Sequence, residues 1–247
     1  MKSVIIIPAR FASTRFPGKP LTKLLKKEMI IWVAELCARA VGKDNVYVAT
    51  DDKRIEDVVN QYGYDAIMTP GEALTGTDRV AMAAEQIEAD IYINVQGDET
   101  LIEPSDILNI RDVKMKNMDM VVNGYCELLD SEVPDSVNLP KVVLNEKEEL
   151  LYMSRSVVPG YKTKRDMPHS YLKQVCIYAF TLDELRLFKS FGRKSRVESN
   201  EDIEILRFLE FDKKIRMVQT SSVSLAVDVP EDVNIVEAEL KRKRGEV

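Results

Sequence analysis

The first twenty residues decide how the chain folds, and they read Met1-Lys2-Ser3-Val4-Ile5-Ile6-Ile7-Pro8-Ala9-Arg10-Phe11-Ala12-Ser13-Thr14-Arg15-Phe16-Pro17-Gly18-Lys19-Pro20. The unbroken apolar run from Val4 to Ile7 predicts a strand buried on both faces. A loop with three cations, Arg10, Arg15 and Lys19, follows directly. Cations at the end of a buried strand are costly unless a negative group neutralises them, so the loop predicts a binding site for a polyanion such as a phosphate chain.

The composition is that of an ordinary globular protein. The chain has 247 residues, of which 45% are hydrophobic and 31% are charged. This length allows one large α/β domain or two small ones. Lysine and arginine number 35 against 41 acidic residues, which gives a formal net charge of −6. Because no general positive charge is present to attract a phosphate backbone, we expect no nucleic-acid partner.

The cysteines and the N-terminal segment predict a cytoplasmic protein. Cys37, Cys126 and Cys176 are widely separated and odd in number, and no Cys-x-x-Cys pair occurs. Each lies among apolar neighbours, so we expect buried free thiols in a reducing compartment. The N-terminus lacks the pattern of a signal peptide, and no apolar run is long enough to cross a bilayer, so we expect no membrane partner. His169 is the single histidine, which leaves catalysis to carboxylates, cations and a bound metal ion rather than to histidine-based triads or multi-histidine metal sites.

Strands and helices alternate through the first hundred residues. Apolar runs predict four strands, at residues 4–7, 45–50, 65–69 and 91–95. Helical spacing predicts a helix over 29–41 that ends at Gly42, and Asp52 and Thr77 are expected to cap the next two helices. The predicted fold class is therefore α/β, with a mostly parallel twisted sheet and helices on both faces. Three polar loops, at 8–20, 75–79 and 96–99, follow the ends of strands, where ligands of such sheets bind, so we expect them to converge on one site.

The second half of the chain is predicted to continue the sheet and to carry an insertion. The predicted elements are helices from residue 104, over 201–211 and from residue 231, and strands at 120–125, 173–180, 215–219 and 224–227. Residues 141–144 and 149–153 resemble a short antiparallel pair, and residues 160–170 form a charged loop. We therefore predict a single domain, 1–247, with a smaller inserted β/α subdomain at about 126–175.

The phosphate motifs of two common nucleotide-binding folds are missing. Pro17-Gly18-Lys19-Pro20 lacks the second glycine and the hydroxyl residue of a Walker loop, and no Gly-x-Gly-x-x-Gly follows the first strand. What remains is a long strand-to-helix loop whose cations and backbone amides could wrap a triphosphate.

Two aspartates end predicted strands. Asp98 follows Gln96-Gly97, and Asp228 follows the apolar residues 225–227. Alone, each has an ordinary explanation, since Gly-Asp turns are common and Asp228 could cap the terminal helix. Beside a triphosphate loop, two carboxylates at strand ends indicate a Mg²⁺ site.

Six motifs, in order along nearly the whole chain, form a specific pattern. They are Pro8-Ala9-Arg10-Phe11-Ala12-Ser13-Thr14-Arg15-Phe16-Pro17-Gly18-Lys19-Pro20-Leu21, Ala49-Thr50-Asp51, Thr75-Gly76-Thr77-Asp78-Arg79, Asn94-Val95-Gln96-Gly97-Asp98-Glu99, Leu151-Tyr152-Met153-Ser154-Arg155-Ser156 and Val227-Asp228-Val229-Pro230-Glu231-Asp232. This pattern resembles the 3-deoxy-manno-octulosonate cytidylyltransferase family. The resemblance implies a fold like that of nucleotide-diphospho-sugar transferases and transfer of CMP from CTP to an acidic sugar, with release of pyrophosphate and with Mg²⁺. It also implies a homodimer formed through the insertion and a place in lipopolysaccharide biosynthesis.

The resemblance assigns expected roles to individual residues. Those implied to bind CTP are Pro8, Ala9, Thr75 and Gly76 at the cytidine and Arg10, Ser13, Arg15 and Lys19 at the triphosphate. Gln96 would lie where nucleotide and acceptor meet, and Asp98 and Asp228 would hold the metal. An acceptor oxygen would attack the α-phosphorus in line, so no protein nucleophile is needed. Arg10, Lys19, Asp98 and Asp228 would be the catalytic residues, because they stabilise the charge that moves onto pyrophosphate.

The acceptor half departs from the family pattern. Gln174 stands where the family has a histidine, and Ile205 replaces the amide of a Glu-Gln-Leu-Arg run. Gly160-Tyr161-Lys162 replaces a stretch like Trp-Asp-Arg. The candidates for acceptor contact are Gln96, Gln174, Tyr178, Glu198 and Glu201. The octulosonate, another sugar acid and a small phosphonate are therefore alternative acceptors, and a CTP-binding regulatory protein without catalysis is a further alternative.

Overall fold

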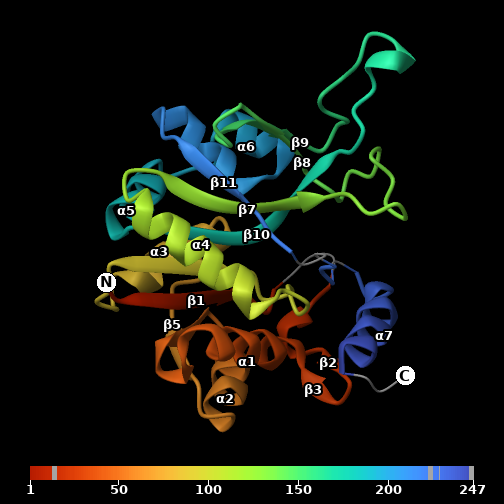
Figure 1. Cartoon of the computed structure of the whole chain (residues 1–247). Coiled ribbons are helices and arrows are strands. Elements are labelled where there is room, and N and C mark those ends of the chain that lie inside the picture. The colour runs from red at the N-terminus through yellow and green to blue at the C-terminus, as the bar shows by residue number, and fades with distance from the viewer. Residues whose placement is uncertain (13–15, 222–224, 228, 245–247) are drawn as a thin grey trace.

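The computed structural model describes residues 1–12, 16–221, 225–227 and 229–244, and it is built around one large sheet (Figure 1). The strands are β1 (Ser3–Ala9), β2 (Lys23–Leu24), β3 (Lys27–Glu28), β4 (Val46–Thr50), β5 (Asp65–Met68), β6 (Ile91–Val95), β7 (Val121–Glu127), β8 (Lys141–Leu144), β9 (Leu150–Ser154), β10 (Leu172–Phe180) and β11 (Ile215–Gln219). The α-helices are α1 (Met29–Val41), α2 (Lys53–Gln61), α3 (Gly76–Ala84), α4 (Pro104–Lys116), α5 (Leu182–Ser190), α6 (Arg196–Glu201) and α7 (Asp232–Arg244). The 3₁₀ helices are η1 (Lys19–Leu21), η2 (Lys43–Asn45), η3 (Lys164–Asp166) and η4 (Glu204–Phe211).

The sheet is mostly parallel, as predicted. The order of its strands is β11-β7-β10-β6-β1-β4-β5. β1 pairs in parallel with β4 and β6, β4 with β5, and β7 with β11. Along this path, as far as the structure describes it, only β10 runs antiparallel to its neighbours.

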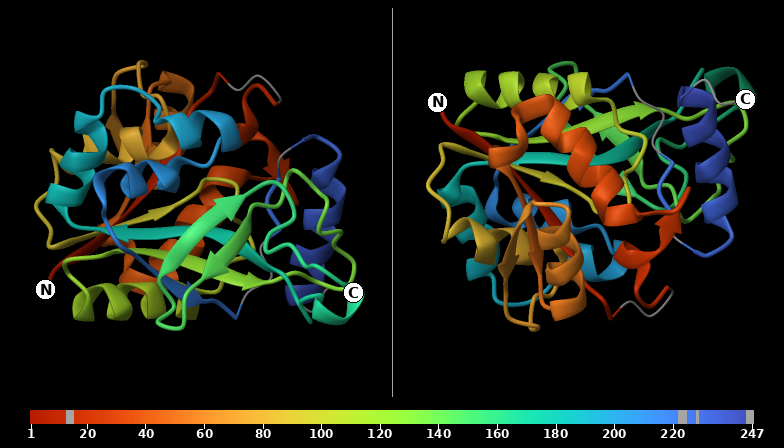
Figure 2. Two further views of the ribbon diagram at one scale, coloured as in Figure 1. Left: turned by 90° about the horizontal axis from the view of Figure 1, so that it is seen from above. Right: turned by 90° about the horizontal axis from the view of Figure 1, so that it is seen from below.

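Alternate side chains of β1 face two separate hydrophobic cores. Ile5 and Ile7 belong to a core with α1, α2 and α4, whereas Val4 and Ile6 belong to a core with α3, α5 and η4. Successive side chains of a strand point to opposite faces of the sheet, so both faces of β1 must be apolar. Figure 2 shows helices flanking the sheet on both sides. The prediction of a strand buried on both faces is confirmed.

The start of α3 differs from the prediction by two residues. Thr75, not Thr77, caps this helix, and its Oγ1 accepts the N–H of Asp78 at 3.2 Å. Thr77 is instead inside the first turn and donates its N–H to Glu204 at 2.9 Å. Both threonines can cap a helix, and the sequence alone did not show that a distant carboxylate holds the second one. By contrast, α1 spans its predicted range and ends at Gly42.

The helix predicted over 201–211 is confirmed in part, since the structure has a 3₁₀ helix over Glu204–Phe211. Ser195 and Glu198 form a capping box that starts α6 earlier, and Asp202, with φ of 51°, ends it in the left-handed region. The chain then forms η4. Apolar spacing continues across this break, whereas capping residues decide where a helix begins and ends.

Two more elements differ from expectation. α5 was not predicted, although Thr181 and Glu184 form a capping box at its start. Residues 225–227 form no strand, so the strand predicted at 224–227 was wrong over these residues, and residue 224 lies outside the described ones. The predicted antiparallel pair is confirmed as β8 and β9.

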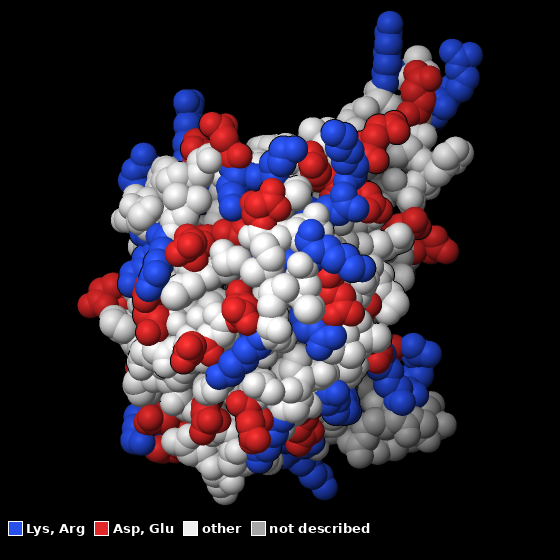
Figure 3. Space-filling model, turned by 60° about the vertical axis from the view of Figure 1, so that its left-hand side comes forward, with Lys and Arg blue, Asp and Glu red and all other residues white. Residues whose placement is uncertain are grey.

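The predicted insertion begins and ends inside the large sheet. Residues 126–127 belong to β7 and residues 172–175 to β10, while the segments between them carry β8 and β9. The segment between β9 and β10 projects from the body of the molecule (Figure 1). Its charged side chains Lys162, Lys164 and Arg165 are exposed, and cations extend from this projection in Figure 3.

The C-terminal helix α7 packs on β2, which follows the loop after β1. A third hydrophobic cluster joins Val236 and Leu240 of α7 to Leu24, Leu101 and Val227. Figure 1 shows α7 beside β2 and β3. The C-terminal helix is thereby held against β2 and against Leu101, which follows β6.

Candidate active site

One cleft gathers most of the residues predicted to act. It has a volume of about 530 Å³ and lies where β1 and β6 end, with β10 in another wall. The predicted site residues that line it are Pro8, Ala9, Arg10, Lys19, Thr75, Gly76, Gln96, Asp98, Gln174, Tyr178 and Glu198. The polar loops after the strands therefore converge on one place, as expected for a parallel sheet.

Gly18 shapes the loop after β1. Its φ is +71°, and its N–H donates to the Phe11 carbonyl at 2.9 Å. A Cβ here would lie 3.2 Å from the Phe11 ring, so backbone conformation and space both favour glycine. The turn brings Lys19 into the cleft, and Arg10 is exposed at the end of β1. The predicted phosphate ligands Ser13 and Arg15 lie outside the described residues.

Lys19 joins the two segments that carry the predicted metal ligands. Its ammonium lies 2.5 Å from Oδ2 of Asp98 and 2.6 Å from the carbonyl oxygen of Val227. The next residue, Asp228, lies outside the described ones. A cation held by these two oxygens acts as a stand-in for a metal ion, so the residues present fit Mg²⁺. Among the described residues no group of three or more His, Cys, Asp or Glu side chains could hold a metal, so phosphate oxygens would have to supply further ligands.

The turn predicted to contact cytidine packs against Gln96. A Cβ on Gly76 would lie 2.8 Å from Nε2 of Gln96, so a larger residue would displace this amide. Nε2 of Gln96 donates to Oε1 of Glu204 at 3.0 Å, and the N–H of Thr77 donates to Oε2 at 2.9 Å. Burial raises the pKa of Glu204, although hydrogen bonds from Thr77 and Thr75 favour its charged form. Glu204 thus fixes the Gln96 amide beside the turn.

A β-bulge in β10 lies between two residues predicted to contact the acceptor, Gln174 and Tyr178. The register against β7 shifts between Val175 and Tyr178, and Asn123 Nδ2 donates to the carbonyls of Val175 and Ile177 at 2.9 and 2.8 Å. Bulges often redirect side chains next to active sites. Nε2 of Gln174 donates to Oδ1 of Asn123 at 3.1 Å and to the hydroxyl of Tyr178 at 3.2 Å. The amide of Gln174 is therefore held by two partners.

The bulge also explains why one thiol is less buried than predicted. All three cysteines are free, and Cys37 and Cys126 are buried as expected. Cys176 is only half-buried, because it lies at the bulge and lines the cleft. Burial among neighbouring carboxylates raises the pKa of this thiol well above its ordinary value.

The two predicted acceptor glutamates have partners of their own. Both oxygens of buried Glu198 accept from Arg207, at 2.6 and 2.7 Å. Glu201 accepts from the Ser154 hydroxyl at 2.8 Å and from the Arg155 N–H at 2.9 Å. In the described part of the chain, Glu201 is not among the residues that line the cleft. Contact of either with an acceptor stays a prediction.

Sequence reasoning missed several charged groups of the cleft. Glu204 opens the run that matched the family only in part, so a signal for it was present. Lys173 pairs with Glu132, and Lys194 pairs with Asp202 at 2.7 Å. These pairs join residues from different segments, and no local pattern marks them.

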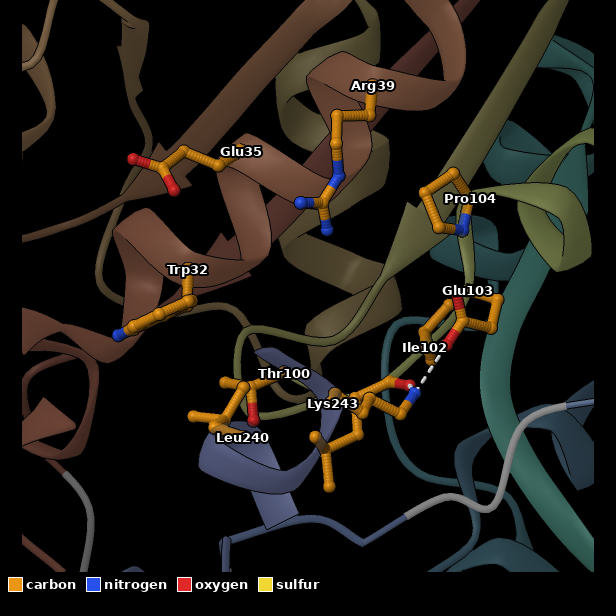
Figure 4. A pocket seen from close by; sticks show the side chains of 10 residues that line it. Trp32, Glu35, Arg39, Thr100, Ile102, Glu103, Pro104, Leu240 and Lys243 are labelled. Atoms are coloured by element: carbon orange, nitrogen blue, oxygen red, sulfur yellow. Dashed lines mark hydrogen bonds and ion pairs between the residues drawn. The ribbon is translucent and has the colours of Figure 1, made fainter. Parts of the chain in front are cut away.

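A second cavity, of about 370 Å³, lies between α1, α7 and the start of α4 (Figure 4). Trp32 and Arg39 come from α1, Leu240 and Lys243 from α7, and Lys243 pairs with Glu103 at 2.5 Å. None of the predicted site residues that the structure describes lines this cavity. The cleft at the ends of β1 and β6 is therefore the candidate active site.

Comparisons with known proteins show which family this chain belongs to. A family model described as Cytidylyltransferase matches residues 4–215. The chain belongs to the cytidylyltransferase family. Within its described residues, this cytidylyltransferase has no helix of the length and hydropathy needed to span a bilayer.

Curated relatives align with nearly the whole length of this cytidylyltransferase. The 3-deoxy-manno-octulosonate cytidylyltransferase of Escherichia coli is 36% identical over 245 residues, which are 99% of this chain and 98% of the relative. The 8-amino-3,8-dideoxy-manno-octulosonate cytidylyltransferase of Shewanella sp. (strain W3-18-1) is 37% identical over 246 residues, 97% of this chain and 99% of the relative. A solved structure of CMP:2-keto-3-deoxy-manno-octonic acid synthetase complexed with CTP matches with a TM-score of 0.89 at 36% identity, over 98% of this chain and 100% of the other. The fold is that of this group of nucleotidyltransferases.

Proposed function

We propose that this cytidylyltransferase transfers CMP from CTP to a sugar acid of the 3-deoxy-octulosonate type and releases pyrophosphate. The observation that carries the proposal is the meeting of Lys19, Asp98 and Gln96 in one cleft, between the phosphate loop and the wall formed by β10. Direct transfer needs the two substrates side by side, because the acceptor oxygen attacks the α-phosphorus in line with the leaving pyrophosphate.

The residues of the chain bind and orient the substrates in this proposal. Arg10 and Lys19 neutralise the triphosphate, and Lys19 can turn from Asp98 to a phosphate oxygen. Gln96, which Glu204 holds in place, lies where the acceptor meets the nucleotide. Mg²⁺ held by Asp98 and by Asp228 would lower the charge of the phosphates. No side chain acts as nucleophile, since the acceptor itself attacks.

The names of the two relatives point to two octulosonates as candidate acceptors. One is named for 3-deoxy-manno-octulosonate and the other for its 8-amino analogue, at nearly equal identity to this chain. The Gln174 amide offers both a donor and an acceptor of hydrogen bonds, so its wall can bind sugar hydroxyls without an imidazole.

The test is pyrophosphate release from CTP over a panel of acceptors. The panel contains both octulosonates, other sugar acids and small phosphonates. We expect turnover with an octulosonate. Turnover with only another acid would assign that acid as the acceptor in place of an octulosonate. Tight CTP binding without turnover on any acceptor would favour the regulatory alternative.

We further propose a homodimer and a cytoplasmic location. The support for the dimer is a set of large apolar side chains that are exposed within the predicted insertion, namely Val133, Val137, Leu151, Tyr152, Tyr161 and Met167. Exposed apolar groups gathered on one part of a protein commonly mark an interaction surface. The support for the location is the use of CTP in the proposed reaction.

A further inference from the structure

Arg207 is a buried cation that joins two carboxylates from different parts of the chain. Its side chain has 0% exposed surface. Nε and Nη2 donate to Glu198 at 2.7 and 2.6 Å, while Nη1 and Nη2 donate to Asp78 at 2.9 and 3.1 Å. The guanidinium also lies 3.7 Å from the centroid of the Phe188 ring. A planar group with several fixed donors suits such two-sided pairing, and lysine cannot reproduce it.

Asp78 connects this cation to the turn expected to contact cytidine. Its Oδ2 accepts the hydroxyl of Thr75 at 2.8 Å, and its N–H donates to the same hydroxyl oxygen at 3.2 Å. Gly76 lies between these two residues in sequence and lines the cleft. The shape of the turn therefore depends on where Asp78 is held, and Arg207 holds it.

A second contact comes from the same 3₁₀ helix. Glu204, three residues before Arg207 in η4, accepts from the N–H of Thr77 and from the Gln96 amide. η4 thus holds the first turn of α3 at two points. Glu198 of α6 also pairs with Arg207. Arg207 therefore contacts both Asp78, which holds the turn, and Glu198, which is predicted to contact the acceptor.

We propose that Arg207 is a positioning residue for recognition of the nucleotide base, and that it acts through Asp78 on the turn at Thr75 and Gly76 without touching either substrate. The inference rests on the proposed function, which puts cytidine at this turn. A buried ion pair adds little net stability compared with apolar side chains, so a role in fixing geometry accounts for a fully buried arginine better than stability does.

The test compares two arginines that pair at opposite ends of α3. Arg207→Lys keeps the charge and removes the forked pairing. Arg186→Lys is the matched control, since exposed Arg186 donates to Glu85, just after α3, at 2.9 and 2.8 Å. For Arg207→Lys we expect the KM for CTP to rise about tenfold and the preference for CTP over UTP to fall by a similar factor, with a smaller change in kcat. The control should match the wild type.

A change in base preference separates positioning from mere stability. Thermal unfolding is measured for every variant, and Asp78→Asn carries the same test if Arg207→Lys fails to fold. A folded variant with a lower melting temperature but an unchanged CTP to UTP ratio would overturn the inference. If the wild type releases no pyrophosphate with any acceptor, the proposed function fails instead. Calorimetric affinities for CTP and UTP then make the same comparison between the variants.

Discussion

Lys19 lies beside Asp98, the residue that we propose as a metal ligand. Its ammonium is 2.5 Å from an oxygen of Asp98, and a Mg²⁺ ion would need that oxygen at about 2.1 Å. A metal ion and the ammonium would repel each other at one carboxylate. We therefore expect the lysine to turn to another anion when Asp98 takes up a metal, and the triphosphate of CTP is the anion that this cleft is expected to receive.

Replacing Lys19 should free Asp98 for a metal in the absence of nucleotide. We expect Lys19→Met to bind Mn²⁺ more tightly than the wild type without CTP, and to release pyrophosphate at least about 100-fold more slowly with it. Electron paramagnetic resonance of Mn²⁺ measures the first effect. Lys27→Met is the control, because Lys27 pairs with Glu35 at 2.6 Å outside the cleft. Equal or weaker Mn²⁺ binding by Lys19→Met would contradict the competition.

Asp98→Asn should have the opposite effect on metal binding. The amide keeps the shape of the side chain but loses the charge that a Mg²⁺ ion needs. We expect pyrophosphate release to fall by about 100-fold or more, while CTP still binds because Lys19 is free to meet the triphosphate. Steady-state kinetics and calorimetry measure the two effects. Normal turnover in this variant would remove Asp98 from the metal site.

At the scale of elements, a buried ion pair joins α4 to α5. Nζ of Lys114 lies 2.7 Å from Oε2 of Glu184, and the two side chains are 0% and 3% exposed. Burial lowers the pKa of Lys114, because removal from water disfavours its charged form. We expect Lys114→Met to lower the free energy of unfolding by about 3 kcal/mol, because Glu184 is left as a poorly compensated buried charge. Urea denaturation measures the loss.

The double variant Lys114→Met, Glu184→Gln tests the reason for that loss. Removing both charges should restore most of the stability, since the cost comes from the buried Glu184 carboxylate, which loses Lys114 and keeps the partly exposed Lys213 at 3.2 Å. A double variant as unstable as Lys114→Met alone would mean that packing, not charge, accounts for the effect.

Elements with a single repeated pattern could be predicted from the sequence, and elements set by distant contacts could not. The range of α1 follows from apolar spacing and Gly42, and β1 from its apolar run. The polar loops of the site could be predicted in the same way, because they directly follow apolar runs that form strands. The buried pairing of Arg207 with Asp78 could not be predicted, because it joins residues 129 positions apart and only the fold brings them together. The start of α3 was missed because a distant carboxylate, Glu204, holds Thr77. The break at Asp202 was missed because capping residues, rather than apolar spacing, set the ends of α6.

At the scale of the whole molecule, the exposed apolar side chains of the predicted insertion test the proposed dimer. Val137 is 65% exposed and Tyr161 is 46% exposed. We expect wild-type protein to sediment as a dimer at micromolar concentration, and Val137→Asp with Tyr161→Asp to shift it towards the monomer, since a buried unpaired charge opposes association. Ile235→Asp on α7 is the control, because Ile235 is 59% exposed outside the insertion. Monomeric wild-type protein would contradict the proposal.

The contact between Lys19 and the Val227 carbonyl affects the order in which the parts of the cleft can form during translation. The lysine leaves the ribosome 208 residues before Val227, and the helix that packs beside Val227 follows later still. Domains can begin to fold during translation, yet Lys19 has no contact with Val227 until that later segment has emerged. A nascent chain can therefore build most of the sheet before this contact of the cleft forms.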